Sequence, residues 1–518
     1  MNSIHRAQDA TSGHAKFDAA TAARLKRARH CQTGLEKLDL CQSLRLVAAT
    51  KHIPAELVQV KNQYTDVPII GPRLSFFNGI KFMMYPQEMC MEGFKKYCGE
   101  PFRVCTPTGW TVVISDRRMA DEMMRESDEL MQPKEATDEL LQIPYTAGRQ
   151  ISNDQYHNEV IRIGLNRNLA DCAPVVFDEV MAACDDELQQ AEFEWKTVSV
   201  YDVVTKVVSR ASNRLFIGLP ICRNPDYVKF TIRITFDIFN AASIINFFPK
   251  SIQPIIAPFV SKRKKDAREA AGYLAKIAQE RLDSIDRYGR DYTDKPNDFL
   301  SWLIDETNEE RREMSNLLSR LVFVNFAAIL STGLTLLRAI YDLVRHAQYI
   351  PELREEVEQV VEAEGFALDK MYKLDSFVRE SQRVTPLAPH TMLRKVRRDF
   401  TFSDGFSVPA GTIFVLNQAA LNLDENIWPD PLRFDPFRYI DEAPTNRLIS
   451  TSNNWLFGHG RHVCAGRALA VQEIKGIMAY LIINYDLKPS KASELEGRPL
   501  PLFKLISWKA NVRKRSST

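Results

Sequence analysis

Residues 455–470 read W-L-F-G-H-G-R-H-V-C-A-G-R-A-L-A and place one cysteine among three glycines. Gly458 and Gly460 allow backbone conformations and close approaches that a side chain would block. An apolar helix is expected from about residue 466 to residue 484, so Cys464 lies just before its start. Free N–H groups and the helix dipole favour an anion at such a position. The loop therefore predicts a cysteine that is prepared to react or to bind a metal.

Two basic residues strengthen this prediction. Arg461 and His462 closely precede Cys464, and nearby positive charge favours the thiolate over the thiol. A catalytic nucleophile would need an adjacent base and an oxyanion hole, and no such signature accompanies the cysteine. A soft thiolate held rigidly in a glycine-rich loop suits the iron of a haem instead. A cysteine-dependent hydrolase, free of haem and with a reactive Cys464 thiol, stays open as an alternative.

The loop also resembles that of a known protein family. Residues 457–466, F-G-H-G-R-H-V-C-A-G, are similar to the haem-binding loop of the cytochrome P-450 monooxygenases, F-G-x-G-x-[R/H]-x-C-x-G, at every fixed position. The resemblance implies that Phe457, Gly458 and Gly466 shape a site for haem b, with Cys464 as the axial thiolate to iron. It implies the family fold, which is mainly α with a minor β portion and one large domain. The haem then lies between a central oxygen-side helix and the helix that follows the cysteine loop.

The resemblance covers most of the chain, from about residue 68 to residue 508. The form of the cysteine loop and the run A-A-I at residues 327–329 look most like filamentous-fungal members that oxidise terpenoids and other secondary metabolites. We expect a leader without a transmembrane helix over residues 1–60 and the haem-thiolate monooxygenase domain over residues 61–518.

Composition and charge exclude several classes of protein. Of the 518 residues, 45% are hydrophobic and 26% are charged, which is an ordinary globular composition. The net charge of +2 predicts no attraction to nucleic acid by charge alone. The nine cysteines lack paired short spacings and no signal peptide precedes them, which favours a reducing, intracellular compartment over a disulfide scaffold.

Helical patterns dominate the chain. The apolar run 321–337 falls short of the roughly 20 residues that a bilayer needs and contains polar residues, so a buried helix is expected there. Helices are expected over most of residues 116–364, and residues 421–440 read as an irregular loop. Strands are expected in short pieces, at residues 102–105 and 111–115 and in a hairpin over residues 400–416.

A second motif is the E-x-x-R pair formed by Glu380 and Arg383. Residues three apart share a helix face, so the two side chains can form a local ion pair. In the family, this pair is joined by an arginine of a later loop, and the segment F-D-P-F-R-Y places Arg438 in that role. The resemblance implies a structural network of buried charges that supports the cysteine loop.

Haem carries two propionates, which need cations. The resemblance places His462 and Arg394 among the propionate partners. It also places His157 and Arg162 on the haem-contacting helix, with His157 where the family often has tryptophan. For Arg162, a solvated helix face is the alternative.

The third motif departs from the family. The oxygen-side helix there usually carries [A/G]-[A/G]-x-[D/E]-T, whereas this chain has A-A-I-L-S-T at residues 327–332. Leu330 stands in the place of the acid and cannot relay a proton. Ser331 or Thr332 is expected to hydrogen-bond to dioxygen and to orient a water chain, the alternative being that both hydroxyls bond back to their own helix. Because the acid is missing, an isomerase, a peroxide-using enzyme or a haem sensor stays open beside the monooxygenase.

The resemblance implies a reaction and its partners. One oxygen atom from O2 enters a C–H bond of a hydrophobic, terpenoid-like molecule, with electrons from an NADPH-dependent reductase. Ala327, Ala328 and Leu387 are candidate pocket residues, together with apolar residues of segment 236–259. Arg461, Arg467 and Lys475 are expected to form a basic face for the reductase. Residues 244–260 are expected to touch a membrane surface peripherally, at the endoplasmic reticulum.

Overall fold

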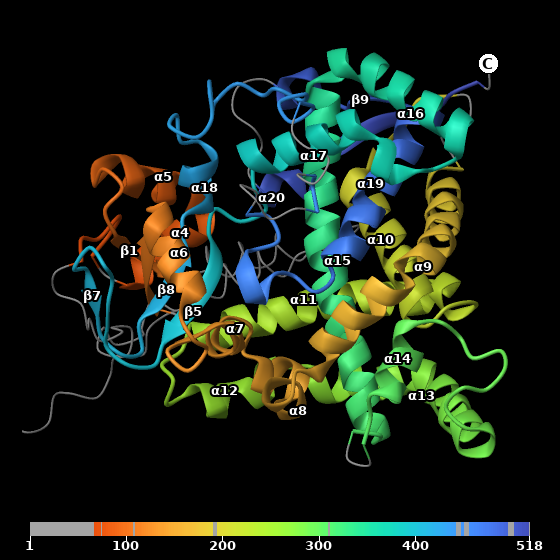
Figure 1. Ribbon diagram of the computed structural model, residues 1–518, viewed down its shortest axis with the longest axis horizontal. Coiled ribbons are helices and arrows are strands. Elements are labelled where there is room, and N and C mark those ends of the chain that lie inside the picture. Colours follow the sequence, from red (N-terminus) through yellow and green to blue (C-terminus); the bar gives the residue numbers. More distant parts are fainter. Residues whose placement is uncertain are drawn as a thin grey trace, which may run out of the picture. The chain divides into compact units, whose positions relative to one another are not determined.

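The computed structural model describes residues 67–73, 75–106, 109–189, 194–308, 311–441, 447–449, 455–495 and 502–516, and its central element is the helix α15, Met314–Arg345. This helix spans 32 residues, and its apolar side chains pack against α10, α11, α13, α17 and α19. It is the one described helix that is long and apolar enough to cross a bilayer, but 67% of its most apolar window is buried within the protein. The expected buried helix is therefore present, and it is longer than the apolar run (Figure 1).

Helices make up most of the described chain. The long helix α9 contains Pro174, and α19 begins at Arg467 and ends at Asn484, as expected from the sequence. The other helices, in chain order, are α4 (Ser75–Met84), α5 (Pro86–Lys96), α6 (Arg117–Arg125), α7 (Pro133–Leu141), η1 (Pro144–Gly148), α8 (Arg149–Asn153), α9 (Tyr156–Leu188), α10 (Val200–Phe216), η3 (Ile221–Arg223), α11 (Pro225–Asn246), α12 (Gln253–Val260), α13 (Arg263–Tyr288), α14 (Phe299–Asp305), η4 (Ala347–Tyr349), α16 (Ile350–Glu364), η5 (Leu368–Lys370), α17 (Tyr372–Val384), α18 (Gln418–Asn422), η6 (Gly460–His462), η7 (Ala492–Glu494) and α20 (Leu502–Leu505).

A five-stranded sheet with the order β1-β2-β8-β5-β3 forms the minor β portion. Its strands are β1 (Phe102–Thr106), β2 (Gly109–Ile114), β3 (Met131–Gln132), β5 (Thr391–Val396) and β8 (Ile413–Leu416). Strands β2 and β8 are parallel, and the other pairs are antiparallel. The parallel neighbours β2 and β8 are buried along their whole length, which explains their runs of Val, Ile and Phe. The strands expected at residues 102–105 and 111–115 are confirmed as β1 and β2.

The other strands were predicted less well. The hairpin of β6 (Phe400–Thr401) and β7 (Ser407–Val408) is confirmed, with Gly405 at φ +92° in its turn. A second sheet, β4-β10-β9, was not predicted; it joins β4 (Lys196–Ser199), β10 (Lys509–Lys514) and β9 (Tyr485–Pro489). Strands β4 and β10 pair across more than 300 residues of sequence, so no local turn signal predicts their pairing.

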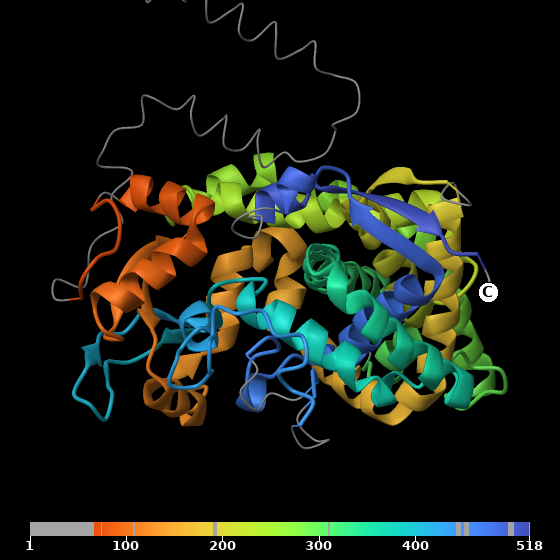
Figure 2. The same ribbon diagram turned by 90° about the horizontal axis from the view of Figure 1, so that it is seen from above.

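The sheet and the long helices occupy different sides of the molecule. Figures 1 and 2 show β1, β5 and β8 on the side opposite α9, α13 and α14, with α15 between them. The cysteine loop and α19 lie beside α15. All described residues belong to the compact unit Pro54–Thr518, and the leader expected over residues 1–60 lies outside the described residues.

Candidate functional site

The cysteine loop turns tightly before α19. Gly458 and Gly460 both adopt positive φ angles, +71° and +73°, which a side chain would disfavour. The N–H group of Cys464 donates to the carbonyl oxygen of Phe457 at 2.9 Å, which closes the loop. Gly466 is the N-cap of α19, so Cys464 lies two residues before the helix cap. The loop therefore presents its sulfur at a helix start, as the sequence predicts.

The surroundings of the Cys464 thiol act in opposite directions. The side chain is exposed, but the protein surrounds it closely enough that desolvation raises the pKa of the thiol. The N–H groups of Gly466 and Arg467 and the charge of Arg467 lower this pKa, by a smaller amount. The prediction that the loop by itself favours the thiolate is wrong, because burial outweighs the helix start. A bound metal ion deprotonates a coordinating thiol in any case.

Helix α15 carries a row of accessible side chains in the middle of an otherwise buried helix. Ala327 and Ser331 are exposed and Phe323 is half-buried, and these positions are four residues apart on one helix face. The Ser331 hydroxyl donates to the carbonyl oxygen of Ala327 at 2.8 Å, which matches, for Ser331, the alternative that the hydroxyl bonds back to its own helix. Thr332 is only 3% exposed and faces the packed interior. Of the two predicted hydroxyls, only Ser331 therefore lies on the open face.

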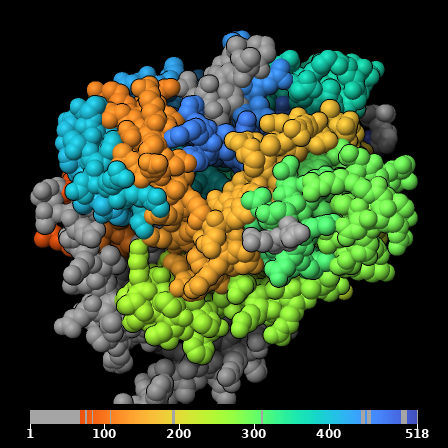
Figure 3. All heavy atoms as spheres, turned by 60° about the horizontal axis from the view of Figure 1, so that its bottom comes forward, coloured from red at the N-terminus to blue at the C-terminus, as the bar shows by residue number. Residues whose placement is uncertain are grey.

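Ala328 and Leu387 are the remaining candidates for the substrate pocket. Ala328 and Leu330 are both half-buried, and both pack against the helical core. Leu387, in the segment between α17 and β5, is also half-buried against this core. Figure 3 shows a hollow bordered by segments coloured orange, gold and blue, with a teal segment at its bottom.

Two arginines and a histidine lie around one carboxylate near the cysteine loop. The His462 Nε2 atom lies 2.7 Å from Asp128 Oδ1, and Arg461 lies 3.6 Å from the same oxygen. Arg394, on β5, is 6% exposed. The charge of Asp128 raises the pKa of the Arg394 guanidinium group, and the charge of Arg461 lowers it. Burial lowers the pKa of Arg394, and within the described part of the chain no carboxylate forms a salt bridge with it. This cluster thus holds more positive than negative charge, and sequence reasoning missed Asp128 because no motif marks it.

The helix α9 places its two candidate residues differently. His157 is 1% exposed, and its Nδ1 atom lies 2.8 Å from Arg320 of α15. Its Nε2 atom is buried and has no hydrogen-bond partner among the described residues. Arg162 lies at the surface in an ion pair with Glu159, which matches the alternative of a solvated helix face.

The E-x-x-R pair and the later arginine are in contact. Arg383 binds both carboxylate oxygens of Glu380, at 2.7 and 2.8 Å, and Arg438 Nε lies 3.2 Å from the same carboxylate. Arg383 also donates to the carbonyl oxygens of Asn422 and Pro431, and the N–H group of Asp435 donates to Glu380. The network thus ties α17 to the irregular loop that leads towards the cysteine.

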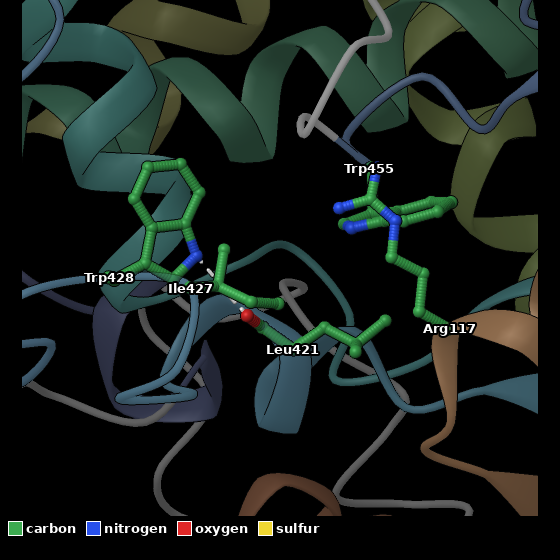
Figure 4. Close-up of a pocket in the computed structure, with 5 residues that line it drawn as sticks. All are labelled: Arg117, Leu421, Ile427, Trp428 and Trp455. Carbon is green, nitrogen blue, oxygen red and sulfur yellow. Dashed lines mark hydrogen bonds between the residues drawn. The ribbon is translucent and has the colours of Figure 1, made fainter.

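A small pocket separates this network from the cysteine loop. It is lined by residues of α6, of α18 and of the loops near the two tryptophans: Arg117, Leu421, Ile427, Trp428 and Trp455. The Trp428 indole N–H donates to the Leu421 carbonyl oxygen at 3.2 Å, as Figure 4 shows, and its ring also lies beneath Arg383. Trp455, which begins the cysteine loop, belongs to the same buried cluster as Leu421, and Ile427 packs against this cluster.

One part of the expected basic face is wrong. Lys475 is 2% exposed and forms a buried salt bridge with Asp375 at 2.9 Å, so it cannot receive a partner protein. Arg467 is half-buried and donates to the Cys464 carbonyl oxygen at 3.2 Å. Arg461 alone of the three is exposed. Lys475 is one of the buried residues of α19. The sequence pattern does not show this, because a lysine in an apolar helix is normally expected at the surface.

A family model with the description "Cytochrome P450" matches residues 68–507. The chain belongs to the cytochrome P450 family. It is 36% identical to cytochrome P450 monooxygenase 71 of Postia placenta over 436 residues, which cover 82% of this chain and 87% of that protein. It is 31% identical to cytochrome P450 monooxygenase CYP512U6 of Ganoderma lucidum, covering 82% and 87% of the two chains. The cytochrome P450 chain is therefore an oxidoreductase, a haem-thiolate monooxygenase whose relatives here are fungal.

Two more distant comparisons agree with this assignment. The chain is 28% identical to the ent-kaurene oxidase of Gibberella intermedia, covering 84% of each chain. The solved structure of retinoic acid bound cyanobacterial CYP120A1 superimposes with a TM-score of 0.64 at 17% identity, covering 87% of this chain and all of the other. At this identity the second comparison shows the fold alone, and it confirms the expected cytochrome P450 fold.

The residues at the site of this cytochrome P450 fit a haem. Cys464 is accessible, and the row on α15 is accessible and apolar apart from Ser331, as a flat, largely apolar group requires. The surplus of cations around Asp128 suits the propionates, and the partnerless Nε2 atom of His157 is a further buried polar group that a propionate would satisfy. The cofactor is haem with a cysteine thiolate as axial ligand, and the cytochrome P450 family uses a redox partner, O2 and a hydrophobic substrate.

Proposed function

We propose that this cytochrome P450 uses Cys464 as the haem ligand and oxidises an uncharged, terpenoid-like molecule with electrons from an NADPH-dependent reductase. When bound, haem supplies the activation of O2 and the insertion of one oxygen atom into a C–H bond. The observation that carries the substrate class is the open row of α15. Residues 321–331 contain no charged side chain, and the accessible ones are apolar apart from Ser331.

The chain's own residues have separate tasks in this proposal. The N–H groups of Gly466 and Arg467 stabilise negative charge on the Cys464 sulfur. Arg394, Arg461 and His462 hold the propionates. The Ser331 hydroxyl donates its hydrogen bond to the Ala327 carbonyl oxygen, which leaves its lone pairs free to accept a hydrogen bond from water.

The small side chains on α15 set the space for the substrate. Ala327 and Ala328 leave room next to Ser331, and Phe323 and Leu387 supply apolar walls that exclude water. An apolar wall cannot compensate a buried charge, so an uncharged hydrocarbon skeleton is favoured over a charged substrate. One of the relatives is named an ent-kaurene oxidase, which supports a terpenoid as the substrate class.

The test uses the full chain produced together with a fungal NADPH–cytochrome reductase. Microsomes are fed a panel of terpenes that includes ent-kaurene, with fatty acids and aromatic acids as comparison substrates. We expect NADPH-dependent products 16 mass units heavier than a terpene. Products from the acids alone would contradict the proposed substrate class.

The haem ligand is tested separately by the reduced carbon monoxide spectrum. We expect the wild type to show the red-shifted Soret band of thiolate coordination and Cys464→Ser to lose it. The matched control is Cys98→Ser, because Cys98 is an exposed cysteine outside the site. A band that survives in Cys464→Ser, or disappears in Cys98→Ser, would contradict the assignment.

We also propose the peripheral membrane contact at residues 244–260. In the helix α12, Ile255 is 64% exposed and Phe259 is 86% exposed, and the two lie four residues apart on one helix face, so they form an apolar patch of the kind that marks an interaction or membrane site. The double variant Ile255→Ser/Phe259→Ser should bind less to phosphatidylcholine vesicles in a flotation assay. Leu432→Ser is the control, because Leu432 is 80% exposed on a different loop. Equal vesicle binding by all three proteins would show that the membrane is reached elsewhere.

A further inference from the structure

The side chain of Arg320 lies inside the protein, on the first half of α15. It is 1% exposed, and its guanidinium group lies over the ring of Tyr156 at 3.9 Å. Its Nε atom donates to Asn316, and its Nη1 atom donates both to the Asp154 carbonyl oxygen at 2.6 Å and towards His157. Burial of a charged guanidinium group costs free energy unless the group is paired or hydrogen-bonded.

The contact with His157 determines which ring nitrogen carries the proton. Arginine has only donors, so the Nδ1 atom of His157, 2.8 Å from Arg320 Nη1, must accept. A neutral imidazole has one donor and one acceptor, and the donor is then Nε2–H. Burial and the charge of Arg320 lower the pKa of His157 to about 3, so the ring is neutral at physiological pH.

The Nε2 atom is buried on the opposite edge of the ring and has no partner among the described residues. The ring of His157 meets Phe323 edge to face, with the centroids 5.5 Å apart. Phe323 belongs to the accessible row of α15, so the histidine lies next to the open site. A buried N–H group without a partner is rare in native proteins, which indicates that a bound group accepts from it.

We propose that Arg320 is a positioning residue that holds His157 in its Nε2–H form, so that this group donates to a haem propionate. The inference rests on the haem site of the proposed function and adds to it a residue of α15 that does not contact haem. The competing explanation is that Arg320 only joins α15 to α9 through Asp154 and Tyr156.

The first measurement identifies the protonated nitrogen directly. In the diamagnetic ferrous carbon monoxide complex of the full chain, labelled with 15N-histidine, long-range proton–nitrogen spectra distinguish the two neutral forms. His157→Phe assigns the resonance. We expect Nε2–H in the wild type and a mixture of the two forms in Arg320→Met. An Nδ1–H form in the wild type would overturn the proposal.

The second measurement follows the rate at which haem passes to an excess of apomyoglobin. His157→Phe and Arg320→Met should each accelerate haem loss about tenfold, the effect of one hydrogen bond, and the double variant should lose it no faster. In a His157→Trp background the donor is the indole N–H, which needs no partner to orient its proton. Arg320→Met should then change the rate less than about twofold.

A matched control separates this role from the general loss of a buried cation. Arg281 is 8% exposed and pairs with Asp298, away from the cysteine loop, so Arg281→Met should leave the rate of haem loss unchanged. If Arg320→Met accelerates haem loss equally in the wild-type and His157→Trp backgrounds, Arg320 only joins the helices and the proposal is wrong. A wild type without the red-shifted carbon monoxide band would instead contradict the haem assignment itself.

Discussion

At the scale of single residues, Leu330 and Ser331 occupy the positions of α15 where the family pattern has an acid and a threonine. Leu330 packs against the core, so the protein offers no carboxylate at this point of α15. Ser331 is the one hydroxyl on the accessible row from Phe323 to Ser331, and its bond to Ala327 fixes its rotamer with the oxygen lone pairs open. We therefore propose that proton delivery at this site depends on the Ser331 side chain and on water bound to it.

The variant Ser331→Ala should uncouple the enzyme. Without the hydroxyl, ordered water loses its partner, and positioned proton donors contribute rate factors of about 100 or more. We expect product formation to fall at least about tenfold while NADPH oxidation continues and releases hydrogen peroxide. The control is Ser319→Ala, because the Ser319 hydroxyl bonds in the same way to the carbonyl oxygen four residues earlier, at 2.7 Å. Unchanged coupling in Ser331→Ala would exclude a role for this hydroxyl.

Glu473 is a second residue whose surroundings change its chemistry. It is fully buried on α19, where Ser212 donates to its Oε1 atom at 2.7 Å, and burial raises its pKa from 4.5 to about 8. The folded protein thus keeps a proton that the unfolded chain loses above about pH 4.5. This group stabilises the fold fully below that pH, and its contribution is lost as the pH rises towards 8.

The variant Glu473→Gln should remove this pH dependence. We expect the variant to be more stable than the wild type by about 2 kcal/mol at pH 7.5, and the difference to vanish near pH 4.5. Denaturant unfolding of the full chain at several pH values measures the difference. A constant difference across the range would show that Glu473 keeps the same charge in both states.

At the scale of elements, the network of Glu380, Arg383 and Arg438 joins α17 to the loop before the cysteine. Arg383 uses its donors on one carboxylate and on carbonyl oxygens of the loop, so it satisfies backbone groups that have no strand or helix partner. The loop holds its form through this side chain rather than through regular secondary structure.

Arg383→Met should therefore destabilise the protein by about 3–5 kcal/mol, because it leaves Glu380 buried with a weakened partner and strips the loop of its donors. We expect the haem content to fall as well. Thermal unfolding and the ratio of Soret to protein absorbance measure both effects. Arg433→Met, at an exposed arginine of the same loop, should stay within about 0.5 kcal/mol of the wild type. Similar losses in both variants would contradict the network's role.

At the scale of the whole molecule, buried histidines set the response to acid. Three of the described histidines have pKa values lowered by burial: His157 to about 3, His346 to about 4 and His390 to about 4. The unfolded chain binds these protons near pH 6.5, whereas the folded protein does not. Stability is therefore lost progressively as the pH falls below about 6.5. Asp342 and Glu473, whose pKa values are raised to about 6 and about 8, offset part of this loss.

The variant His346→Phe should make the protein less sensitive to acid. The ring of His346 stacks on Phe434 with the centroids 4.1 Å apart, so phenylalanine keeps the packing and removes the titrating group. We expect little change in the free energy of unfolding at pH 7.5 and a gain of about 1–2 kcal/mol at pH 5. An equal effect at both pH values would show that packing rather than protonation is responsible.

The sequence by itself determined those features whose physical causes lie within a few residues. The positive φ angles of Gly458 and Gly460, the start of α19 at Arg467 and the pairing of Glu380 with Arg383 follow from local backbone freedom, helix capping and helix spacing. The family pattern predicted the cofactor, because the residues of the cysteine loop form one continuous segment of sequence.

Only the tertiary structure decided the rest, because the groups involved come from distant parts of the chain. Arg320 meets His157 across 163 residues, Asp128 meets His462 across 334, and burial of Lys475 depends on Asp375, 100 residues earlier. Burial of Thr332 and exposure of Ser331 depend likewise on which helices pack against α15. Desolvation and ion pairing depend on distance in space, and a sequence pattern reports only distance along the chain.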